Sequence, residues 1–557
     1  MKNSEKANKR LDHCGSTSRL LFGAAAVCVF TLISVATASA DNSSRRPIAF
    51  TESGLVIGST TDGGNQFLGI PYAAPPVGAL RWRPPKRYGF FPGFVLQATQ
   101  FGSACTQPGG IGSENCLFLN VFTPPVKSDD GWHDRDRDRN RHGLPVMFWI
   151  HGGGLINGSS TPYNPELLVK KDVIVVTINY RLGFLGFFAQ SAIDAEGHLN
   201  GNYGLMDQQF ALGWVRRNIA RFGGDPDRVT IFGESAGGQS VYAQLASPLA
   251  SGMFRGAIAE SGSYAEFQDY FFNVITLAQA ETTGSSSVPA GAAIADSVGC
   301  ASQTASCLRA VPAATMVAAE PFPLYPFVDG TLLTQTMTAA FASGEFNHVP
   351  VISGTNHDEY RLFVALDYDL VGNPILTSAE YDTAVTNLWG PALAPSVLAL
   401  YPFAAYPIGG EALGASGTDG VFSCPARNVD QTLSKVVPTY AYEFNDENAP
   451  PAQSAFGGLL TFPLGAYHSA ELQYLFPGID VFGLPTTLSS QQIQLSDAMV
   501  SYWTQFAKNG NPNSSGEPLW SPYNASSDEF QSLTPPVPVV ESNFDSGHRC
   551  STFWNTF

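Results

Sequence analysis

VTIFGESAGG, residues 229–238, is the stretch of this sequence that decides the fold. The apolar residues 229–232 predict a strand, residues 233–237 predict a tight turn, and residues 239–249 contain few helix breakers. A strand, a tight turn and a helix are the context in which a G-x-S-x-G pattern presents a serine as a nucleophile, here Ser235. A glycine-rich loop that happens to contain a serine is the alternative, and the motif alone does not exclude it.

Similar apolar runs recur along the chain and alternate with helix-like segments. They lie at residues 146–150, 173–180, 229–232, 256–261, 349–353 and 439–444. Continuous apolar strands between helices indicate a sheet that is covered on both faces. The pattern therefore predicts an α/β fold with a large, mostly parallel central sheet and helices on both faces.

The first 40 residues have the pattern of a signal peptide. Lysines and arginines precede an uncharged apolar stretch, residues 20–40, which ends in the small residues ATASA. This length also suits a membrane anchor, but small residues fill its second half and favour cleavage. We expect an exported protein with residues 1–40 as signal peptide and 41–557 as a single domain, without another membrane span.

Charge and cysteines restrict the class of protein further. The net charge of −17 disfavours binding to nucleic acid or to anionic membranes. Six cysteines follow residue 40, and an even number in an exported chain predicts disulfides. A zinc site is the alternative, but none of the cysteine spacings forms a C-x-x-C pair. The six are Cys105, Cys116, Cys300, Cys307, Cys424 and Cys550.

A second glycine motif belongs to the same chemistry as Ser235. The predicted strand at 146–150 runs into His151, Gly152, Gly153 and Gly154. Consecutive glycines after a strand can direct backbone N–H groups to one point, as an oxyanion hole requires. A flexible hinge is the alternative.

A serine nucleophile needs a base, and the base needs an orienting acid. In folds with this motif the acid and then the histidine follow the serine along the chain. The histidines beyond Ser235 are His348, His357, His468 and His548. Chain order and loop position favour His468, while Asp358 and Glu359, which follow the predicted strand at 349–353, stay equal candidates for the acid.

Several longer blocks resemble the type-B carboxylesterase/lipase family, the relatives of cholinesterases. They are FLGIPYAAPP at 67–76 with LRW at 80–82, SENCLFLN at 113–120, the long run 201–238, and CSTFWN at 550–555. The resemblance spans essentially the whole chain after residue 40. It implies the α/β-hydrolase fold and an ester-hydrolysing activity that needs no cofactor and no metal.

The resemblance also assigns roles that spacing leaves open. It implies that Glu359 is the acid and His468 the base of a triad with Ser235, and that Glu234 supports the charge at the site. The oxyanion donors it implies are the N–H groups of Gly153, Gly154 and Ala236. The implied disulfides are Cys105–Cys116, Cys300–Cys307 and Cys424–Cys550, and Arg81 and Glu114 correspond to a structural salt bridge of the family.

The sequence therefore predicts an exported serine carboxylesterase that forms an acyl-enzyme on Ser235. Its expected partner is a small-molecule or lipid ester, without nucleic acid and without a stable membrane span in the mature chain. A lipase that acts on long-chain acylglycerols is the alternative within the enzymes, and a non-catalytic binding or adhesion module is the alternative outside them. Residues 106–115 contain no tryptophan, which disfavours a dedicated choline esterase.

Overall fold

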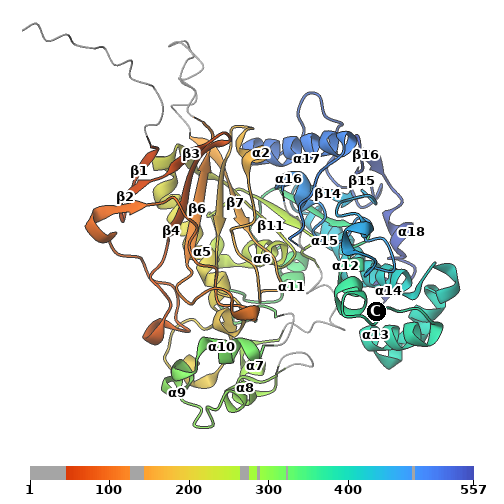
Figure 1. The fold of residues 1–557 in the computed structure, drawn as a ribbon, viewed down its shortest axis with the longest axis horizontal. Helices are drawn as coiled ribbons and strands as arrows, with labels where there is room; N and C mark the ends of the chain where they lie inside the picture. Colours follow the sequence, from red (N-terminus) through yellow and green to blue (C-terminus); the bar gives the residue numbers. More distant parts are fainter. Residues whose placement is uncertain are drawn as a thin grey trace, which may run out of the picture. The chain divides into compact units, whose positions relative to one another are not determined.

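One large sheet runs through the described part of the chain (Figure 1). The computed structural model describes residues 46–125, 143–263, 275–284, 289–320, 324–478 and 483–556, so the expected signal peptide lies outside it. The strand order in the sheet is β16-β15-β14-β13-β12-β11-β7-β8-β6-β4-β3. These strands are β3 (Ser59–Thr61), β4 (Gly64–Pro71), β6 (Phe118–Thr123), β7 (Leu144–Ile150), β8 (Ile174–Ile178), β11 (Gly224–Glu234), β12 (Gly256–Glu260), β13 (Val351–Asn356), β14 (Thr439–Phe444), β15 (Phe530–Leu533) and β16 (Val539–Glu541).

The centre of the sheet is parallel and its margins are antiparallel. The neighbours from β8 through β7, β11, β12, β13 and β14 to β15 all pair in parallel. The outer pairs β15–β16, β8–β6, β6–β4 and β4–β3 are antiparallel. The six apolar runs of the sequence are β7, β8, β11, β12, β13 and β14, so the predicted mostly parallel sheet is confirmed.

Small sheets and many helices complete the fold. The sheets are β1 (Ile48–Thr51), β2 (Gly54–Ile57) and β5 (Val95–Gln97), and β9 (Phe187–Phe188) with β10 (Gly201–Asn202). The longer helices are α5 (Tyr203–Asn218), α6 (Ala236–Ala246), α13 (Ser378–Leu400), α14 (Gly409–Gly417), α15 (Cys424–Leu433) and α17 (Ser490–Asn509). The shorter ones are α2 (Glu166–Val169), α3 (Gly183–Gly186), α4 (Ser191–Asp194), α7 (Leu277–Thr282), α8 (Gly291–Ser297), α9 (Ala305–Ala310), α10 (Ala313–Ala318), α11 (Met337–Ser343), α12 (Arg361–Val364), α16 (Leu472–Leu475) and α18 (Phe544–His548).

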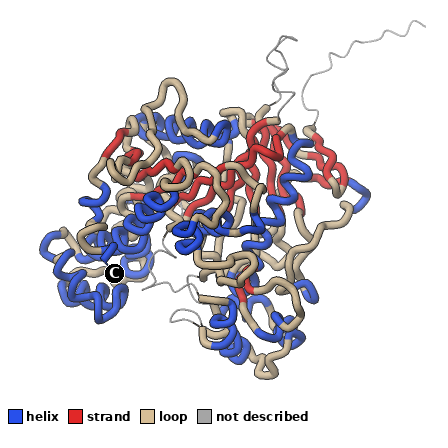
Figure 2. Tube along the Cα trace, turned by 180° about the vertical axis from the view of Figure 1, so that it is seen from behind, coloured by secondary structure: helices blue, strands red, loops and turns tan. Residues whose placement is uncertain are grey.

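Helices cover both faces of the sheet because alternate side chains of its strands point to opposite sides. Phe148 of β7 belongs to one core with residues of α5 and α6. Trp149, the next residue, belongs to a second core with residues of α16 and α17. Figure 2 shows the strands in red between helices in blue. This arrangement confirms the predicted α/β-hydrolase architecture.

One helical segment was not singled out by the sequence pattern. Among the described residues, Ser378–Ala405, which includes α13, is long and apolar enough to cross a membrane. Its Tyr381, Trp389 and Val397 are fully buried in the second core, and the helix packs on α14. Core helices meet the same criterion of length and hydropathy, so this segment does not by itself indicate a membrane span.

Disulfides and an ion pair link residues within the unit that begins at Arg46. The structure contains the disulfides Cys105–Cys116, Cys300–Cys307 and Cys424–Cys550, which are the pairs that the family resemblance implies. Arg81 binds Glu114 with two hydrogen bonds, Nε to Oε2 at 2.7 Å and Nη2 to Oε1 at 2.6 Å. Disulfides persist in oxidising compartments and indicate an extracellular or lumenal protein.

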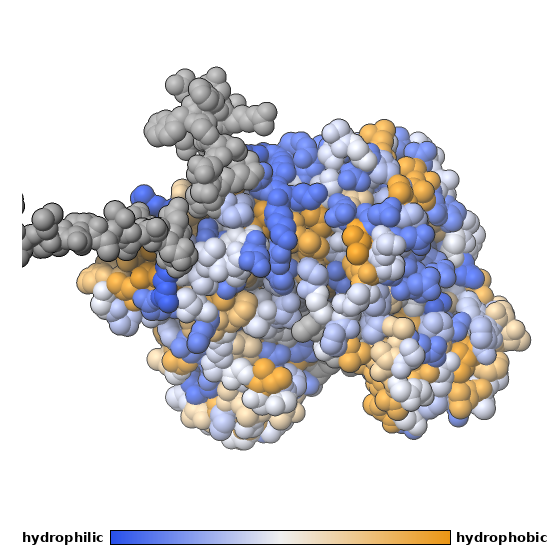
Figure 3. Space-filling view, turned by 45° about the horizontal axis from the view of Figure 1, so that its top comes forward, coloured by the Kyte–Doolittle hydropathy of each residue, from blue (hydrophilic) through white to orange (hydrophobic). Residues whose placement is uncertain are grey.

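One face of the molecule shows how hydrophilic and hydrophobic side chains are distributed. Figure 3 shows a face on which hydrophilic side chains predominate and hydrophobic ones gather in separate patches.

Candidate active site

Ser235 lies at the sharp turn between β11 and α6. Its φ of 57° and ψ of −124° are a strained conformation for a residue with a side chain. A Cβ on Gly233 or Gly237 would come closer than 3.0 Å to the carbonyl oxygen of Ile150 in β7. Both positions therefore require glycine, and the predicted strand, tight turn and helix are present around the serine.

His468 and Glu359 come together from two loops far apart in the sequence. Glu359 follows β13 and His468 lies in the loop after β14, and both are buried. The Nδ1 atom of His468 is 2.5 Å from Oε2 of Glu359. The other carboxylate oxygen, Oε1, accepts hydrogen bonds from Thr355 Oγ1 at 2.8 Å and from the backbone N–H of Asn356 at 2.7 Å. These bonds hold the carboxylate in the orientation that faces the imidazole.

Asp358, the other carboxylate of this loop, points elsewhere. It accepts a hydrogen bond from the backbone N–H of Ala466 at 2.9 Å and forms an ion pair with Arg361 at 3.0 Å. Spacing left Asp358 and Glu359 equal as candidates for the acid. Of these two carboxylates, only Glu359 contacts the ring of His468, whereas Asp358 lies 3.4 Å from the ring of His357.

The second ring nitrogen of His468 faces Glu234, the residue before the serine. His468 Nε2 lies 3.2 Å from Glu234 Oε1. Among the hydrogen bonds of the described residues, none joins the Ser235 hydroxyl to His468. The structure thus brings Glu359 and His468 together beside the turn that carries Ser235, with Glu234 at ion-pair distance from Nε2.

Buried carboxylates dominate the electrostatics of the site. Burial lowers the pKa of His468, but the negative charges of Glu234 and Glu359 outweigh burial and raise it above its ordinary value. Burial raises the pKa of Glu234 and of Glu471, and it raises the pKa of Glu260 to about 8. The site therefore favours a charged imidazole over further negative charge.

The three residues expected to supply the oxyanion donors are Gly153, Gly154 and Ala236. Gly153 (φ 102°) and Gly154 (φ 62°) have conformations that favour glycine, and Ala236 is the first residue of α6. The first N–H groups of a helix have no partner within the helix. In the described part of the chain, none of these three N–H groups donates a hydrogen bond to another protein atom. Backbone N–H groups without a protein partner are what an oxyanion hole requires.

A cavity of about 340 Å³ adjoins the glycine loop at Gly153, but Ser235 and His468 are not among the described residues that line it. Its lining includes Gly152, Gly153, Tyr163, Glu234 and Ser469, so a ligand in it would lie against the glycine loop and the carboxylate beside Ser235. Site residues that the sequence did not indicate are Ser469, Tyr163 and Glu260. Ser469 follows His468 directly, which is the only signal in the sequence that could have singled it out.

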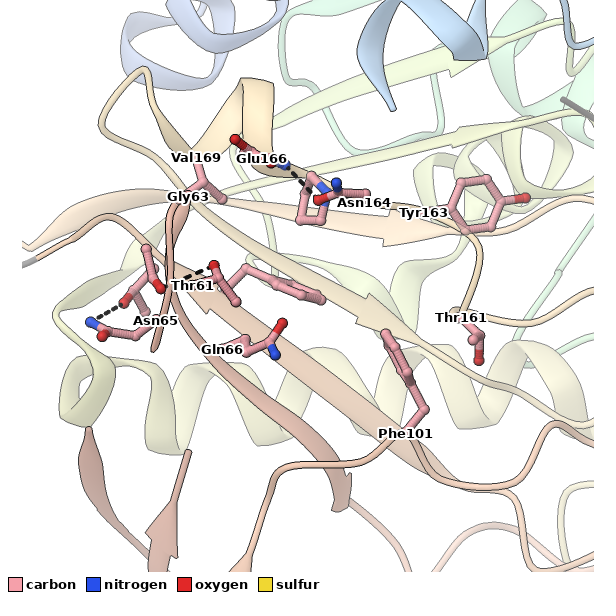
Figure 4. Close-up of a pocket in the computed structure, with 14 residues that line it drawn as sticks. Thr61, Gly63, Asn65, Gln66, Phe101, Thr161, Tyr163, Asn164, Glu166 and Val169 are labelled. Carbon is pink, nitrogen blue, oxygen red and sulfur yellow. Dashed lines mark hydrogen bonds between the residues drawn. The ribbon is translucent and has the colours of Figure 1, made fainter. Parts of the chain in front are cut away.

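A second cavity of similar volume, about 340 Å³, lies beyond Tyr163 (Figure 4). Its lining includes Asn65, Gln66, Phe101 and Asn164, and Tyr163 borders both cavities. It contains none of the residues that the sequence predicted for catalysis. Within the described residues, no group of His, Cys, Asp and Glu has an arrangement that could hold a metal ion.

Comparisons with known proteins show the family of the chain. The model of the carboxylesterase family matches residues 45–551. The chain is 34% identical to the para-nitrobenzyl esterase of Bacillus subtilis, covering 91% of this chain and 98% of that protein. It is 34% identical to the acylcarnitine hydrolase of Mus musculus, with 86% of both chains covered, and 33% identical to the cocaine esterase of Homo sapiens, with 89% of both covered.

Solved structures of esterases have the same fold. A PNB esterase superposes with a TM-score of 0.72 at 32% identity and covers 91% of this chain and 100% of its own. EstA of Aspergillus niger superposes with a TM-score of 0.73 at 27% identity and covers 92% of this chain and 98% of its own.

Proposed function

The chain belongs to the carboxylesterase family and is a carboxylic ester hydrolase, and from this premise we propose that it acts as an exported serine esterase with Ser235 as nucleophile. In this proposal His468 is the general base, Glu359 orients it, and the N–H groups of Gly153, Gly154 and Ala236 form the oxyanion hole. No step requires a cofactor.

The first half of the reaction forms the acyl-enzyme. The Ser235 oxygen attacks the ester carbonyl carbon while His468 Nε2 accepts the hydroxyl proton. For this step the ring must turn so that Nε2 contacts the Ser235 hydroxyl instead of Glu234. Glu359, at Nδ1, fixes the ring tautomer and stabilises the imidazolium that forms. The tetrahedral oxyanion is stabilised by the three backbone donors. The imidazolium then protonates the alcohol oxygen as its bond to carbon breaks.

The second half releases the acid. Water attacks the acyl carbon and gives a proton to His468, and a second oxyanion forms in the same place. When this intermediate collapses, the proton returns to the Ser235 oxygen and the carboxylic acid leaves. We expect the substrates of this reaction to be small-molecule esters, in line with the names of the related hydrolases and esterases.

One observation carries the proposal: the 2.5 Å contact of His468 Nδ1 with Glu359 beside the strained turn of Ser235. A buried base held by a carboxylate, next to a serine on a tight turn, is the arrangement that activates a hydroxyl nucleophile. Free N–H groups at Gly153 and Ala236 support the same chemistry. Export is supported by the three disulfides and by the signal-peptide pattern of residues 1–40, with the mature chain folding as one domain.

Covalent labelling tests the nucleophile directly. We expect a fluorophosphonate probe to label Ser235 in the wild type, and Ser235→Ala to lose both the label and the hydrolysis of p-nitrophenyl butyrate. Ser261 is a matched control, because it is buried, has a φ of 50° and follows the neighbouring strand β12. Ser261→Ala should keep the label. Turnover retained by Ser235→Ala, or a label on another residue of the wild type, would refute this assignment.

A further inference from the structure

Ser469, the residue after His468, is held in a conformation that suits glycine better than serine. Its φ is 72°, in the left-handed region where a Cβ is unfavourable, and the residue is 8% exposed. A residue with a Cβ keeps such a conformation only where the surrounding structure imposes it.

The hydroxyl of Ser469 has a specific partner. It donates a hydrogen bond of 2.6 Å to Oε1 of Glu234. The same oxygen lies 3.2 Å from His468 Nε2. Glu234 ends β11 and Ser469 lies in the loop after β14, so this bond joins the nucleophile turn to the histidine loop.

Few other contacts orient the Glu234 carboxylate. Its Oε2 faces Gly152, where any Cβ would lie about 3.0 Å from it. Among the described residues, Ser469 is the only group that donates a hydrogen bond to the Glu234 side chain, while the His468 ring lies at ion-pair distance from it. Glu234 and Ser469 both line the cavity, so the carboxylate borders open space into which it can turn when the hydroxyl is removed.

We propose that Ser469 is a positioning residue, whose hydroxyl fixes the Glu234 carboxylate so that the His468 ring is held between Glu234 and Glu359. The proposal rests on the function of His468 as general base. It explains why a residue with a side chain occupies a backbone conformation that glycine would adopt without strain.

The charges around Glu234 set the direction of the effect. The positively charged ring of His468 faces the Glu234 carboxylate. The neighbouring carboxyl groups belong to Glu359, Glu260 and Glu471. The Tyr163 hydroxyl lies on the cavity side of Glu234. The hydrogen bond from Ser469 lowers the pKa of Glu234 against the effect of burial, and charged Glu234 raises the pKa of His468. Loss of the hydroxyl should therefore lower the pKa of His468.

Two substitutions separate positioning from a merely structural role. Ser469→Gly and Ser469→Ala both remove the hydroxyl, but only Gly relieves the backbone strain. We expect Ser469→Gly to raise Tm relative to Ser469→Ala. In both variants the acidic limb of the kcat/KM profile for p-nitrophenyl butyrate should move to lower pH by the same amount, because His468 loses the attraction of Glu234.

The background of Glu234→Gln completes the test. In that background neither Ser469 substitution should move the acidic limb further. A change of Tm with an unmoved pH profile would overturn the proposal, as would an equal shift in both backgrounds. Fluorophosphonate labelling of the same proteins distinguishes a failure of the Ser469 role from a failure of the proposed function. A normal label at Ser235 with an unmoved pH profile refutes only the role of Ser469. Absence of the label from wild-type Ser235 refutes the proposed function and this inference with it.

Discussion

The imidazole of His468 contacts Glu359 and not Asp358, although the two carboxylates are adjacent in the sequence. His468 Nδ1 is 2.5 Å from Glu359 Oε2, while Asp358 is occupied by Arg361 and the backbone N–H of Ala466. The contact is buried, so the carboxylate acts on the ring through a medium that screens charge weakly.

We predict that Glu359→Gln lowers kcat for p-nitrophenyl butyrate by about 10³–10⁴-fold, because an amide holds the ring in the wrong tautomer and does not stabilise the imidazolium. Asp358→Asn is the matched control and should lower kcat by less than about 10-fold. Steady-state kinetics of both variants measure the difference. The assignment of the acid is wrong if Asp358→Asn proves the more damaging of the two.

Gly153→Ala should lower kcat by about 10²–10³-fold, the effect of losing one oxyanion donor. A Cβ on Gly153 would collide with Asn157 and push the glycine loop out of place. Gly197 serves as the control, because its φ of 74° also favours glycine but a Cβ there meets nothing within 4 Å. Gly197→Ala should cost only backbone strain, seen as a small fall in Tm, and keep its activity. Equal kinetics in the two variants would argue against an oxyanion role for the loop.

The disulfide Cys424–Cys550 should contribute more stability than Cys300–Cys307. The two cysteines are 126 residues apart in the first pair and 7 in the second. By restricting the unfolded chain, the first disulfide should add about 5 kcal/mol to the free energy of unfolding and the second about 2 kcal/mol. Urea unfolding of the two double alanine variants measures the difference, and a larger loss in the 300–307 variant would contradict the prediction.

The contacts of the buried His548 with two carboxylates lead us to expect that the free energy of unfolding falls at alkaline pH. Its Nδ1 is 2.6 Å from Asp419 and its Nε2 is 2.5 Å from Glu443. Burial lowers the pKa of His548, but the two carboxylates outweigh burial and raise the pKa from 6.5 to about 10. Because the folded state favours the charged ring, its contribution is complete below pH 6.5 and is lost as the pH rises toward about 10.

We therefore expect the free energy of unfolding to fall between pH 6.5 and 10, and His548→Gln to make this slope shallower. His348→Gln, at an exposed position, is the control and should leave the slope as it is in the wild type. Chemical denaturation at a series of pH values provides the measurement. A slope that His548→Gln does not change would show that other groups cause the alkaline loss.

Much of the fold could be predicted from the pattern of apolar residues along the sequence. The apolar runs at β7, β8 and β11–β14 are continuous because both faces of a parallel sheet are buried, and such runs are visible in a single sequence. The membrane-like hydropathy of Ser378–Ala405 is not evident as one apolar run, because glycine and proline interrupt the segment. The disulfide pairs came from family resemblance, because spacing alone allows many pairings of six cysteines.

The sequence by itself determined the strand, the tight turn and the glycines around Ser235, because these depend on local sterics within a few residues. Only the tertiary structure decided that Glu359 and not Asp358 meets His468, that Glu234 faces the other ring nitrogen, and that Ser469 binds Glu234. Those contacts join segments separated by 109 to 235 residues. Neighbours along the chain do not specify them, because they depend on the register in which parallel strands bring their loops to one edge of the sheet.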